Sequence, residues 1–338
     1  MPLSIDAATP SPQGDAQPVA WVLHDGKAGM RSQALGLAEA TGFRIVEKSL
    51  TVRAPWAYLP PQLWLAPLAA VRDNGLSLRP PWPDVVIGCG RNTVLPGLAI
   101  QRASGGRTVA AQVQDPRIGR DRFDLLLVPE HDRLGGHQVI TSKGALNRVT
   151  PKILAAARDR FPELAALPRP ILGVLIGGAN RAYSLGLDRL GQIADAIATS
   201  VRASGGSVVL TPSRRTGGAG VALLRERLQG LPAAVWDMTG DNPYYTYLAV
   251  ADAFLVTADS VSMVSEAAAT GKPVHIIELD GGDAKFMRFH AAMREAGITR
   301  RFSGRIESWT YPPLDDTARA GATLRALVLD RLKARRAT

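Results

Sequence analysis

The sequence has almost no cysteine: Cys89 is the single one among 338 residues. One cysteine cannot form an internal disulfide, and it cannot supply the ligand clusters of cysteine-rich zinc modules. The chain needs no oxidising compartment, so a cytoplasmic location is expected. Aromatic residues are also few, at 6%, and the basic residues are scattered rather than massed. This pattern argues against nucleic-acid binding, which uses stacking aromatics and clustered cations.

Long hydrophobic runs are scarce as well. The one long apolar stretch without a charge covers residues 54–71 and contains four prolines. Prolines at this density break a membrane-spanning helix, so no transmembrane segment is expected. Two interpretations of the stretch remain open. It is either a pair of short core helices or a tryptophan- and proline-rich segment that dips into an anionic membrane, which would place the protein peripherally on the inner face of the membrane.

The composition that remains is that of a globular protein with a basic excess. Hydrophobic residues make up 46% of the chain and charged residues 21%, which is typical of a folded chain with a substantial core. Forty basic against thirty acidic residues give a net charge of +10, which favours anionic partners. Residues 1–18 lack the basic start and the apolar run of a signal peptide, so we expect a disordered leader there.

Short apolar runs alternate with helix-like stretches from residue 21 onward, which is the rhythm of βαβ units. The runs are almost uniformly apolar, as expected of parallel strands that are covered on both faces. The predicted strands form two series, 20–23, 43–47, 84–87, 108–112, 125–128 and 139–140, then 171–176, 207–210, 234–236, 253–256 and 274–277.

These two series predict an α/β fold of two Rossmann-like domains that face each other across a cleft. A proline-punctuated segment, residues 161–170, separates the series. The tail is helical in composition, and we expect it to pack back on the first domain. The predicted units are the leader 1–18, the N-terminal Rossmann-like domain 19–160, the C-terminal Rossmann-like domain 165–314 and the C-terminal helix 315–338.

Ligands of open α/β sheets bind beyond the carboxyl ends of the strands, so polar residues that follow the strands are the candidate site. His24 and Asp25 follow the first strand and are candidates for a general base, with Asp115 in reserve. The alternative for His24 and Asp25 is that they belong to a helix-capping loop, in which His24 has only a structural role. Further candidates on the acceptor side of the cleft are Gly26, Lys27, Gly90, Arg91 and Asn92.

The second half places glycines, hydroxyls and arginines after its strands. Such groups can hold phosphate through backbone N–H groups, capped helix starts and two-pronged guanidinium contacts. Ordinary tight turns and solvated arginines are the alternatives. A carboxylate near the helix start, that of Glu266, can reach a ribose. The candidate nucleotide-binding residues are Gly177, Gly178, Asn180, Ser213, Arg214, Arg215, Ser260, Ser262 and Glu266. No metal is predicted, because His131, Asp132 and His137 lack a recognised ligand spacing.

The hydroxyl-rich strand end, Glu266 and the Gly271-Lys272-Pro273 run together resemble the donor-binding domain of GT-B glycosyltransferases. In the first half, residues 83–90 with 96–99 resemble the acceptor domain of the enzyme that adds N-acetylglucosamine to lipid-linked peptidoglycan precursors. From about residue 21 to 313 the chain more closely resembles bacterial members of a mitochondrial fission family named after a plant elongated-mitochondria protein. That resemblance is carried by His24–Gln33, Gln114–Arg117, Pro129–Asp132, Ser213–Thr216 and Ser260–Glu266.

The resemblance implies a metal-independent glycosyltransferase that moves a sugar from a nucleotide diphosphate donor to a lipid or glycan acceptor of the cell envelope. No cofactor is expected besides the nucleotide sugar, which is the substrate. The expected partners are the nucleotide sugar, the acceptor and the surface of an anionic membrane, and no nucleic acid. The alternative implied by the family name is a non-catalytic adaptor that keeps a GT-B-like fold and recruits a protein partner.

Overall fold

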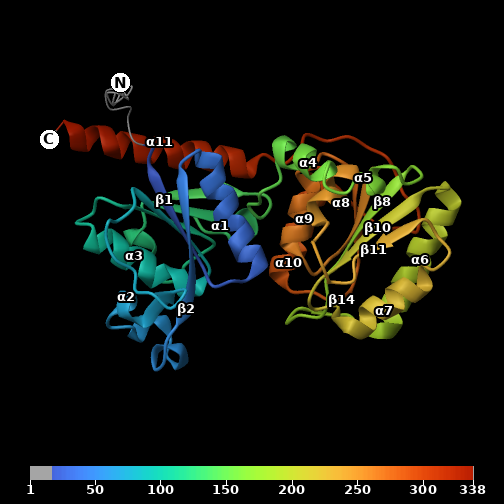
Figure 1. The fold of residues 1–338 in the computed structure, drawn as a ribbon, viewed down its shortest axis with the longest axis horizontal. Coiled ribbons are helices and arrows are strands. Elements are labelled where there is room, and N and C mark those ends of the chain that lie inside the picture. Colours follow the sequence, from blue (N-terminus) through green and yellow to red (C-terminus); the bar gives the residue numbers. More distant parts are fainter. Residues whose placement is uncertain (1–16, 338) are drawn as a thin grey trace, which may run out of the picture.

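The computed structural model describes residues 17–337, so nearly all of the predicted leader lies outside the described residues. The first of two parallel sheets lies on the left in Figure 1, with strand order β3-β2-β1-β4-β5-β6-β7. All of its neighbouring strands are parallel except β2 and β3, which are antiparallel. Its strands are β1 (Val19–His24), β2 (Arg44–Val52), β3 (Val71–Asp73), β4 (Val85–Cys89), β5 (Val109–Val113), β6 (Leu125–Pro129) and β7 (Val139–Ser142).

The second sheet has the strand order β11-β10-β8-β12-β13-β15, and all of its strands are parallel. A separate antiparallel pair, β9 with β14, lies beside it. The strands of this half are β8 (Ile171–Ile176), β9 (Tyr183–Ser184), β10 (Ser207–Pro212), β11 (Ala233–Val235), β12 (Ala253–Thr257), β13 (Val274–Ile277), β14 (Asp280–Gly281) and β15 (Thr299–Arg301).

Helices connect the strands and cover both sheets. The helix start at Pro151 shows how the local sequence decides a boundary. Proline needs no N–H partner at the first helical position, and the Thr150 hydroxyl accepts a hydrogen bond from the Ile153 N–H at 3.2 Å. The helices are α1 (Ala28–Thr41), α2 (Pro67–Ala70), α3 (Val94–Ala103), α4 (Pro151–Arg158), α5 (Pro162–Ala165), α6 (Leu187–Ser204), α7 (Gly217–Arg227), α8 (Tyr244–Val250), α9 (Val261–Ala268), α10 (Ala284–Glu295) and α11 (Asp316–Arg336).

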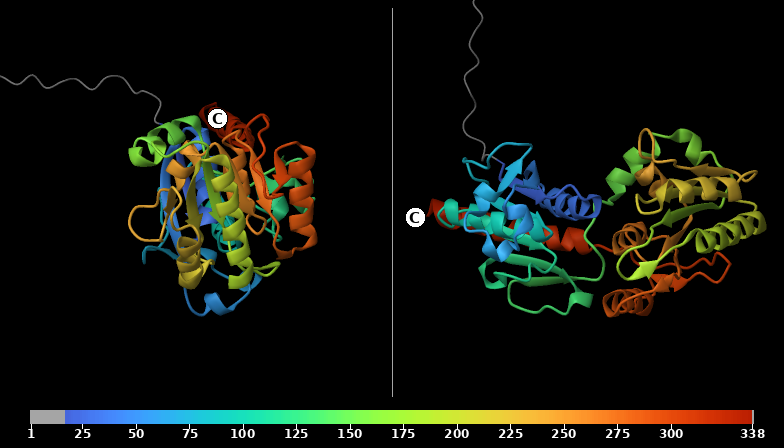
Figure 2. Two further views of the ribbon diagram at one scale, coloured as in Figure 1. Left: turned by 90° about the vertical axis from the view of Figure 1, so that its right-hand side faces the viewer. Right: turned by 90° about the horizontal axis from the view of Figure 1, so that it is seen from below.

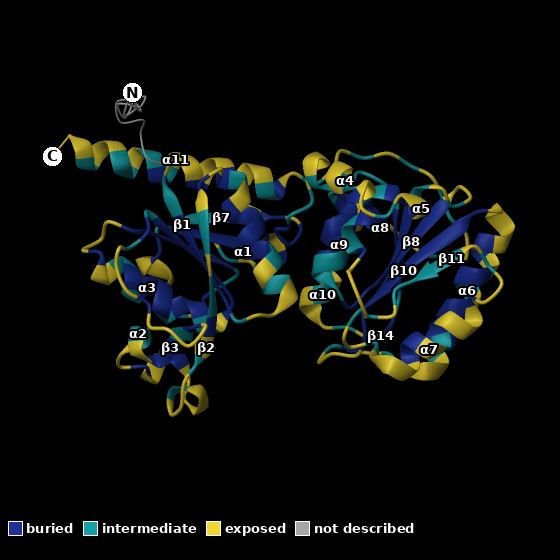
Figure 3. Ribbon diagram, in the orientation of Figure 1, coloured by how far each residue is buried: buried dark blue, intermediate teal, exposed yellow. Residues whose placement is uncertain are grey.

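Successive residues of a strand serve different cores, as strand geometry requires. On β1, Ala20 and Val22 pack with residues of α1 and α11. Trp21 and Leu23 point to the opposite face and pack with residues of α3. Figure 3 shows the strands of both sheets as buried and the outer helix faces as exposed. Both faces of the central strands are therefore apolar, which is why these strands appear in the sequence as continuous apolar runs.

Helix α11 brings the end of the chain back across the molecule. In Figure 1 it runs along the upper side of the first domain, next to α1. Ala320, Leu324 and Val328 are buried in the same core as β1. Gly321 lies so close to Ala40 of α1 that an added Cβ atom would come within 3.0 Å of it, so glycine permits the two helices to touch.

The predicted α/β class with two Rossmann-like domains is confirmed, and each of the predicted strands is present. The strands that the sequence did not reveal, β3, β9, β14 and β15, are only two or three residues long. They carry little apolar pattern because most of their residues are polar. Within residues 17–337, no helix combines the length and apolar character needed to cross a membrane.

Candidate functional site

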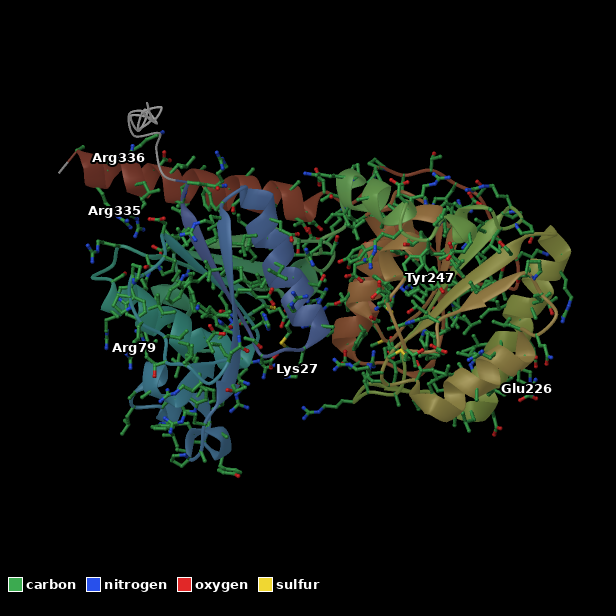
Figure 4. The ribbon with its side chains drawn as sticks, in the orientation of Figure 1. Lys27, Arg79, Glu226, Tyr247, Arg335 and Arg336 are labelled. Carbon is green, nitrogen blue, oxygen red and sulfur yellow. The ribbon has the colours of Figure 1, made fainter. Side chains whose placement is uncertain are left out.

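The N-termini of α1 and α9, one from each domain, meet where both sheets end. A Cβ atom added to Gly29 of α1 would lie 3.3 Å from the Ser262 hydroxyl of α9. One turn further on, the Ser32 hydroxyl donates to Glu266 at 3.2 Å. Figure 4 places the Lys27 side chain at this junction of the domains. The first N–H groups of a helix have no partner within the helix, and they make its N-terminus electropositive, so the junction favours an anion.

A cavity of about 680 Å³ lies beside this junction and is lined by both domains. The first domain contributes Gly90, Arg91 and Asp115 from the ends of its strands, and the second contributes Lys285 of α10. The Lys285 ammonium forms an ion pair of 2.7 Å with Asp132, across the domain boundary. The cavity therefore has cationic groups and lies at the carboxyl edge of the first sheet, where ligands of such sheets bind.

The loop after β5 is strained where it borders this cavity. Gln114 and Arg117 have φ angles of 71° and 62°, a conformation that non-glycine residues rarely adopt. Between them, Asp115 accepts two hydrogen bonds from the Arg120 guanidinium, at 2.8 and 2.6 Å. Burial alone would raise the pKa of Asp115, but hydrogen bonds from Arg120 and from the Arg117 N–H hold it below its usual value. A carboxylate paired in this way is a weak base, so proton abstraction by Asp115 would require the pair to open.

His24 is buried at the end of β1, and both of its ring nitrogens have partners. Its Nδ1 accepts from the Gly26 N–H at 3.0 Å, and its Nε2 donates to Glu47 at 2.7 Å. Arg31 of α1 binds the same carboxylate, at 2.5 and 2.8 Å, and this is the main reason that the pKa of Glu47 is lowered. His24 thus holds the loop in place, and the predicted role as a general base would require one of these bonds to break.

Asp25 lies beside a second cavity, of about 460 Å³, within the first domain. Its carboxylate is paired with Lys27 at 2.6 Å, and the Lys27 side chain is exposed. Trp56 and Trp64 line the same cavity, and Arg91 lines both this cavity and the one at the junction. The two cavities therefore adjoin. Asp25 and Asp115 both line cavities, but Asp25 is held by the exposed Lys27 alone, whereas Asp115 is held by Arg117 and Arg120.

The residues predicted for the acceptor side follow the ends of β1 and β4, and their role stays a prediction. Gly90 has a φ of 91°, and the Met30 sulfur occupies the space that a side chain there would need. Lys27, Arg91 and Asn92 line the smaller cavity. The glycine therefore allows a close approach of α1, while its neighbours face the cavity.

In the second domain, the N–H groups of Gly177 and Gly178 are occupied within the protein. The first donates to the Thr257 hydroxyl at 2.8 Å and the second to Asp259 at 3.0 Å. These N–H groups are not available to a phosphate, contrary to the prediction. The Asp259 carboxylate sits where a Cβ atom at position 177 would be, so glycine is needed here for close packing.

Asp259 also anchors the turn after β10, and this was not foreseen from the sequence. Its buried carboxylate pairs with the Arg215 guanidinium at 2.7 Å, and Arg215 donates to the Gly178 carbonyl at 2.8 Å. The Ser213 hydroxyl donates to the Gly177 carbonyl at 2.8 Å, which fixes the other end of the turn. A carboxylate directly after a buried strand is the signal that could have revealed this anchor.

Arg214 is the residue that this turn presents to solvent. It is exposed, and it has no ion-pair partner among residues 17–337. With Ser213 and Arg225 it lines a third cavity, of about 460 Å³, at the ends of β10 and β11. The two arginines that were predicted to bind phosphate therefore differ in role. Arg215 stabilises the turn, and Arg214 lines the cavity.

The remaining predicted residues are mainly engaged within the protein. The Asn180 amide donates to the Asp259 carbonyl at 3.2 Å, and the Ser260 hydroxyl caps α9 by accepting from the Met263 N–H at 3.3 Å. Glu266 is buried at the domain boundary, between Ser32 and the Tyr244 hydroxyl at 2.5 Å. Both of its oxygens are occupied, so the predicted contact with a ribose would require one of these partners to leave.

His131, on the short helix η5 (Glu130–Asp132), is buried between the two domains. Its ring packs edge-on against Phe289 of α10, and Arg288 donates to its carbonyl at 3.0 Å. Burial lowers its pKa to about 4, with Lys285 and Arg288 acting in the same direction and Asp132 opposing them. Among the described residues, no group of three or more His, Cys, Asp or Glu side chains is placed to hold a metal ion.

We expect acid to weaken this boundary through His131. The folded protein binds this proton less tightly than the unfolded chain, so the free energy of unfolding falls as the pH drops from about 6.5 to about 4. The full effect is about 3 kcal/mol. The measurement is urea unfolding against pH for His131→Phe, which should be less acid-sensitive than the wild type. His137→Phe, at an exposed position of the same loop, serves as the control. Equal acid sensitivity of all three proteins would contradict this role.

Comparison with known proteins places the chain in a family. Residues 28–328 match the family model described as mitochondrial fission ELM1. The mitochondrial fission protein ELM1 of Arabidopsis thaliana is 35% identical over 272 residues, which are 72% of this chain and 63% of the plant protein. The match thus spans less than two thirds of the plant relative. The uncharacterized protein RP120 of Rickettsia prowazekii is 24% identical, over 90% of this chain and 97% of its own length.

Among solved structures, the UDP-GlcNAc 2-epimerase of Methanocaldococcus jannaschii aligns with a TM-score of 0.55 at 12% identity. The alignment covers 92% of this chain and 99% of the epimerase. At this level of identity the similarity concerns the fold alone, in agreement with two Rossmann-like domains in a GT-B-like arrangement. The chain belongs to the mitochondrial fission ELM1 family and has a GT-B-like fold.

Proposed function

We propose that this protein is a glycosyltransferase that moves a sugar from a nucleotide diphosphate to a lipid or glycan acceptor of the cell envelope. The observation that carries the proposal is the convergence of the α1 and α9 N-termini, at Gly29 and Ser262, beside the cavity lined by both domains. Two electropositive helix ends that meet beside a cavity favour a multiply charged anion. Together with Arg91 and Lys285, they would neutralise a diphosphate without a metal ion.

The third cavity, beside Arg214, is the proposed seat of the nucleoside. In the sheet order, β10 and β12 are separated by β8 alone, so their ends lie two strand spacings apart, about 10 Å. A nucleoside diphosphate is long enough to extend over this distance. The nucleoside would then lie near Ser213 and Arg214, with the diphosphate toward the helix ends at the junction.

Asp25 is the proposed base on the acceptor side. In the transfer, the acceptor hydroxyl oxygen bonds to the anomeric carbon of the sugar and the bond from that carbon to the phosphate oxygen breaks. The hydroxyl proton passes to Asp25, and the nucleoside diphosphate leaves with the electron pair of the broken bond. Asp25 is suited to this step because it lines the tryptophan-walled cavity that adjoins the junction.

The comparisons support a nucleotide-sugar substrate only at the level of the fold. The epimerase with the similar fold is named for UDP-GlcNAc, and its fold spans nearly this whole chain. The family name supports the alternative function, a non-catalytic adaptor that recruits a protein partner. The two functions differ in whether the junction binds a nucleotide diphosphate.

We expect one nucleotide among UDP, GDP, ADP, CMP and dTDP to raise the melting temperature, with and without magnesium. A ligand that binds only the folded state stabilises it, by about 5–10 °C when present at about a hundredfold excess over its Kd. Arg214→Gln should reduce this shift because it removes a cation from the cavity. Arg202→Gln, an exposed arginine on α6, should keep it. If no nucleotide shifts the wild type, the adaptor is favoured over the transferase.

A further inference from the structure

The exposed large apolar side chains gather on one part of the molecule. Residues 53–79 follow β2 and include the edge strand β3. The part before β3 forms a projection at the bottom of Figure 1, which is also visible in the left view of Figure 2. On it, Leu65 is 98% exposed, Tyr58 86% and Leu63 55%. Leu59 is exposed there too, as is Leu76 after β3, and only two other large apolar side chains of the described residues, Leu187 and Met287, are as open to solvent.

The projection is built on an ordered base. Trp64 is buried, and its indole N–H donates to the Trp56 carbonyl at 3.1 Å. Trp64 belongs to the same core as Trp21 and Leu23 of β1, and Trp56 packs against it. The two tryptophans therefore anchor the segment, so the outward apolar side chains are presented on a fixed support.

The charge on the projection has one sign. Arg53 is exposed at the start of this segment, and Arg79 is exposed at its end, on the side of the first domain away from the lower tip (Figure 4). The single acid between residues 53 and 79 is Asp73, which is buried and paired with Lys48 at 2.9 Å. The projection thus combines outward leucine and tyrosine side chains with Arg53 and exposes no acidic residue.

We propose that this projection docks on an anionic lipid bilayer. Tyr58, Leu63 and Leu65 would enter the interface between headgroups and acyl chains, and Arg53 would contact the headgroup phosphates. A bilayer fits better than a protein partner because these side chains are largely exposed and belong to a segment that projects from the domain. Docking on a protein usually buries such side chains in a fitted, closely packed interface. The net charge of +10 acts in the same direction.

Docking there would decide what reaches the cavity beside Asp25. Trp56, Leu59 and Trp64 of the projection form a wall of that cavity, so its apolar side would be held close to the headgroups. An acceptor with an acyl or polyprenyl chain could pass from the bilayer along this wall and place its hydroxyl-bearing head near Asp25. This consequence rests on the proposed transferase function, whereas the docking itself does not.

The test is flotation of the full chain with phosphatidylcholine vesicles, prepared with and without phosphatidylglycerol. We expect the protein to float with the anionic vesicles and to be released by salt. The double variant Leu63→Glu with Leu65→Glu should lose at least about tenfold of this binding, because it places charge in the apolar contact. Leu187→Glu, on the exposed surface of α6, is the matched control and should bind like the wild type.

The docking is overturned if the wild type floats with neither vesicle or if the double variant floats as well as Leu187→Glu. It is also overturned if the wild type is a dimer that the double variant dissociates, because the tip would then cover a second copy. Normal melting of the double variant shows that it is folded, which is expected because both leucines are exposed. If the protein floats with the vesicles but no nucleotide raises its melting temperature, the docking proposal is supported and the transferase proposal is contradicted.

Discussion

Gly177→Ala should lower the free energy of unfolding by about 3 kcal/mol and the melting temperature by about 6–12 °C. The added methyl group would lie less than 3.0 Å from both carboxylate oxygens of Asp259. That carboxylate cannot swing aside without losing the Gly178 N–H and the Arg215 guanidinium. The turn that presents Arg214 would loosen with it, so we also expect nucleotide binding to be lost.

The control for this prediction is Gly191→Ala on α6 of the same domain. A Cβ atom there meets its nearest neighbours at 3.9 Å, which is ordinary contact, and alanine is the better helix former. This variant should gain about 0.5–1 kcal/mol. Both are measured by thermal unfolding, followed by titration with the nucleotide that stabilises the wild type. A Gly177→Ala protein that melts like Gly191→Ala would show that Asp259 does not hold the turn.

Glu266→Ala should destabilise the protein by about 2–3 kcal/mol, because it leaves the buried Tyr244 hydroxyl without its partner. It also removes the bond to Ser32, which joins the two domains. Glu266→Gln should be much milder, since the amide can still pair with both hydroxyls and carries no charge to bury. Urea unfolding of both variants at neutral pH measures the difference.

The pH dependence distinguishes this account from simple loss of packing. Burial raises the pKa of Glu266 above its ordinary value of 4.5, so the folded protein holds this proton more tightly than the unfolded chain. The contribution of Glu266 to the free energy of unfolding therefore falls as the pH rises from 4.5 through the raised pKa. Glu266→Gln should remove that part of the pH dependence. If the free energy of unfolding of Glu266→Gln depended on pH as that of the wild type does, burial would not disfavour the charged form of Glu266.

Glu266 also shows why nucleotide binding should be tested with Arg214 first. A loss of binding in Glu266→Ala could follow from altered domain contacts as well as from a lost ribose contact. Within residues 17–337, Arg214 has no ion-pair or hydrogen-bond partner whose loss would disturb the fold. A nucleotide effect of Arg214→Gln would therefore report on the site itself.

The sequence predicted the α/β class and the position of each long strand. Parallel strands that are buried on both faces consist of apolar residues, so they are visible in the sequence as continuous apolar runs. It also predicted which loops lie at the carboxyl edges, since that follows from the order of strands and helices. The missed strands are two or three residues long and mostly polar, so they leave no apolar run in the sequence. The sequence did not decide whether Tyr58, Leu63 and Leu65 are buried or exposed, because an apolar stretch has the same pattern in a core as on a surface. The structure shows them exposed.

The tertiary structure alone decided which polar groups remain free. His24 is hydrogen-bonded to Glu47, 23 residues away, and Glu266 to Ser32, 234 residues away. These bonds occupy the ring nitrogen and the carboxylate oxygen that were predicted to contact a substrate. Asp259 occupies the Gly178 N–H in the same way. Residue type states what a side chain can bind, whereas its actual partner depends on contacts between distant segments, which no local pattern records.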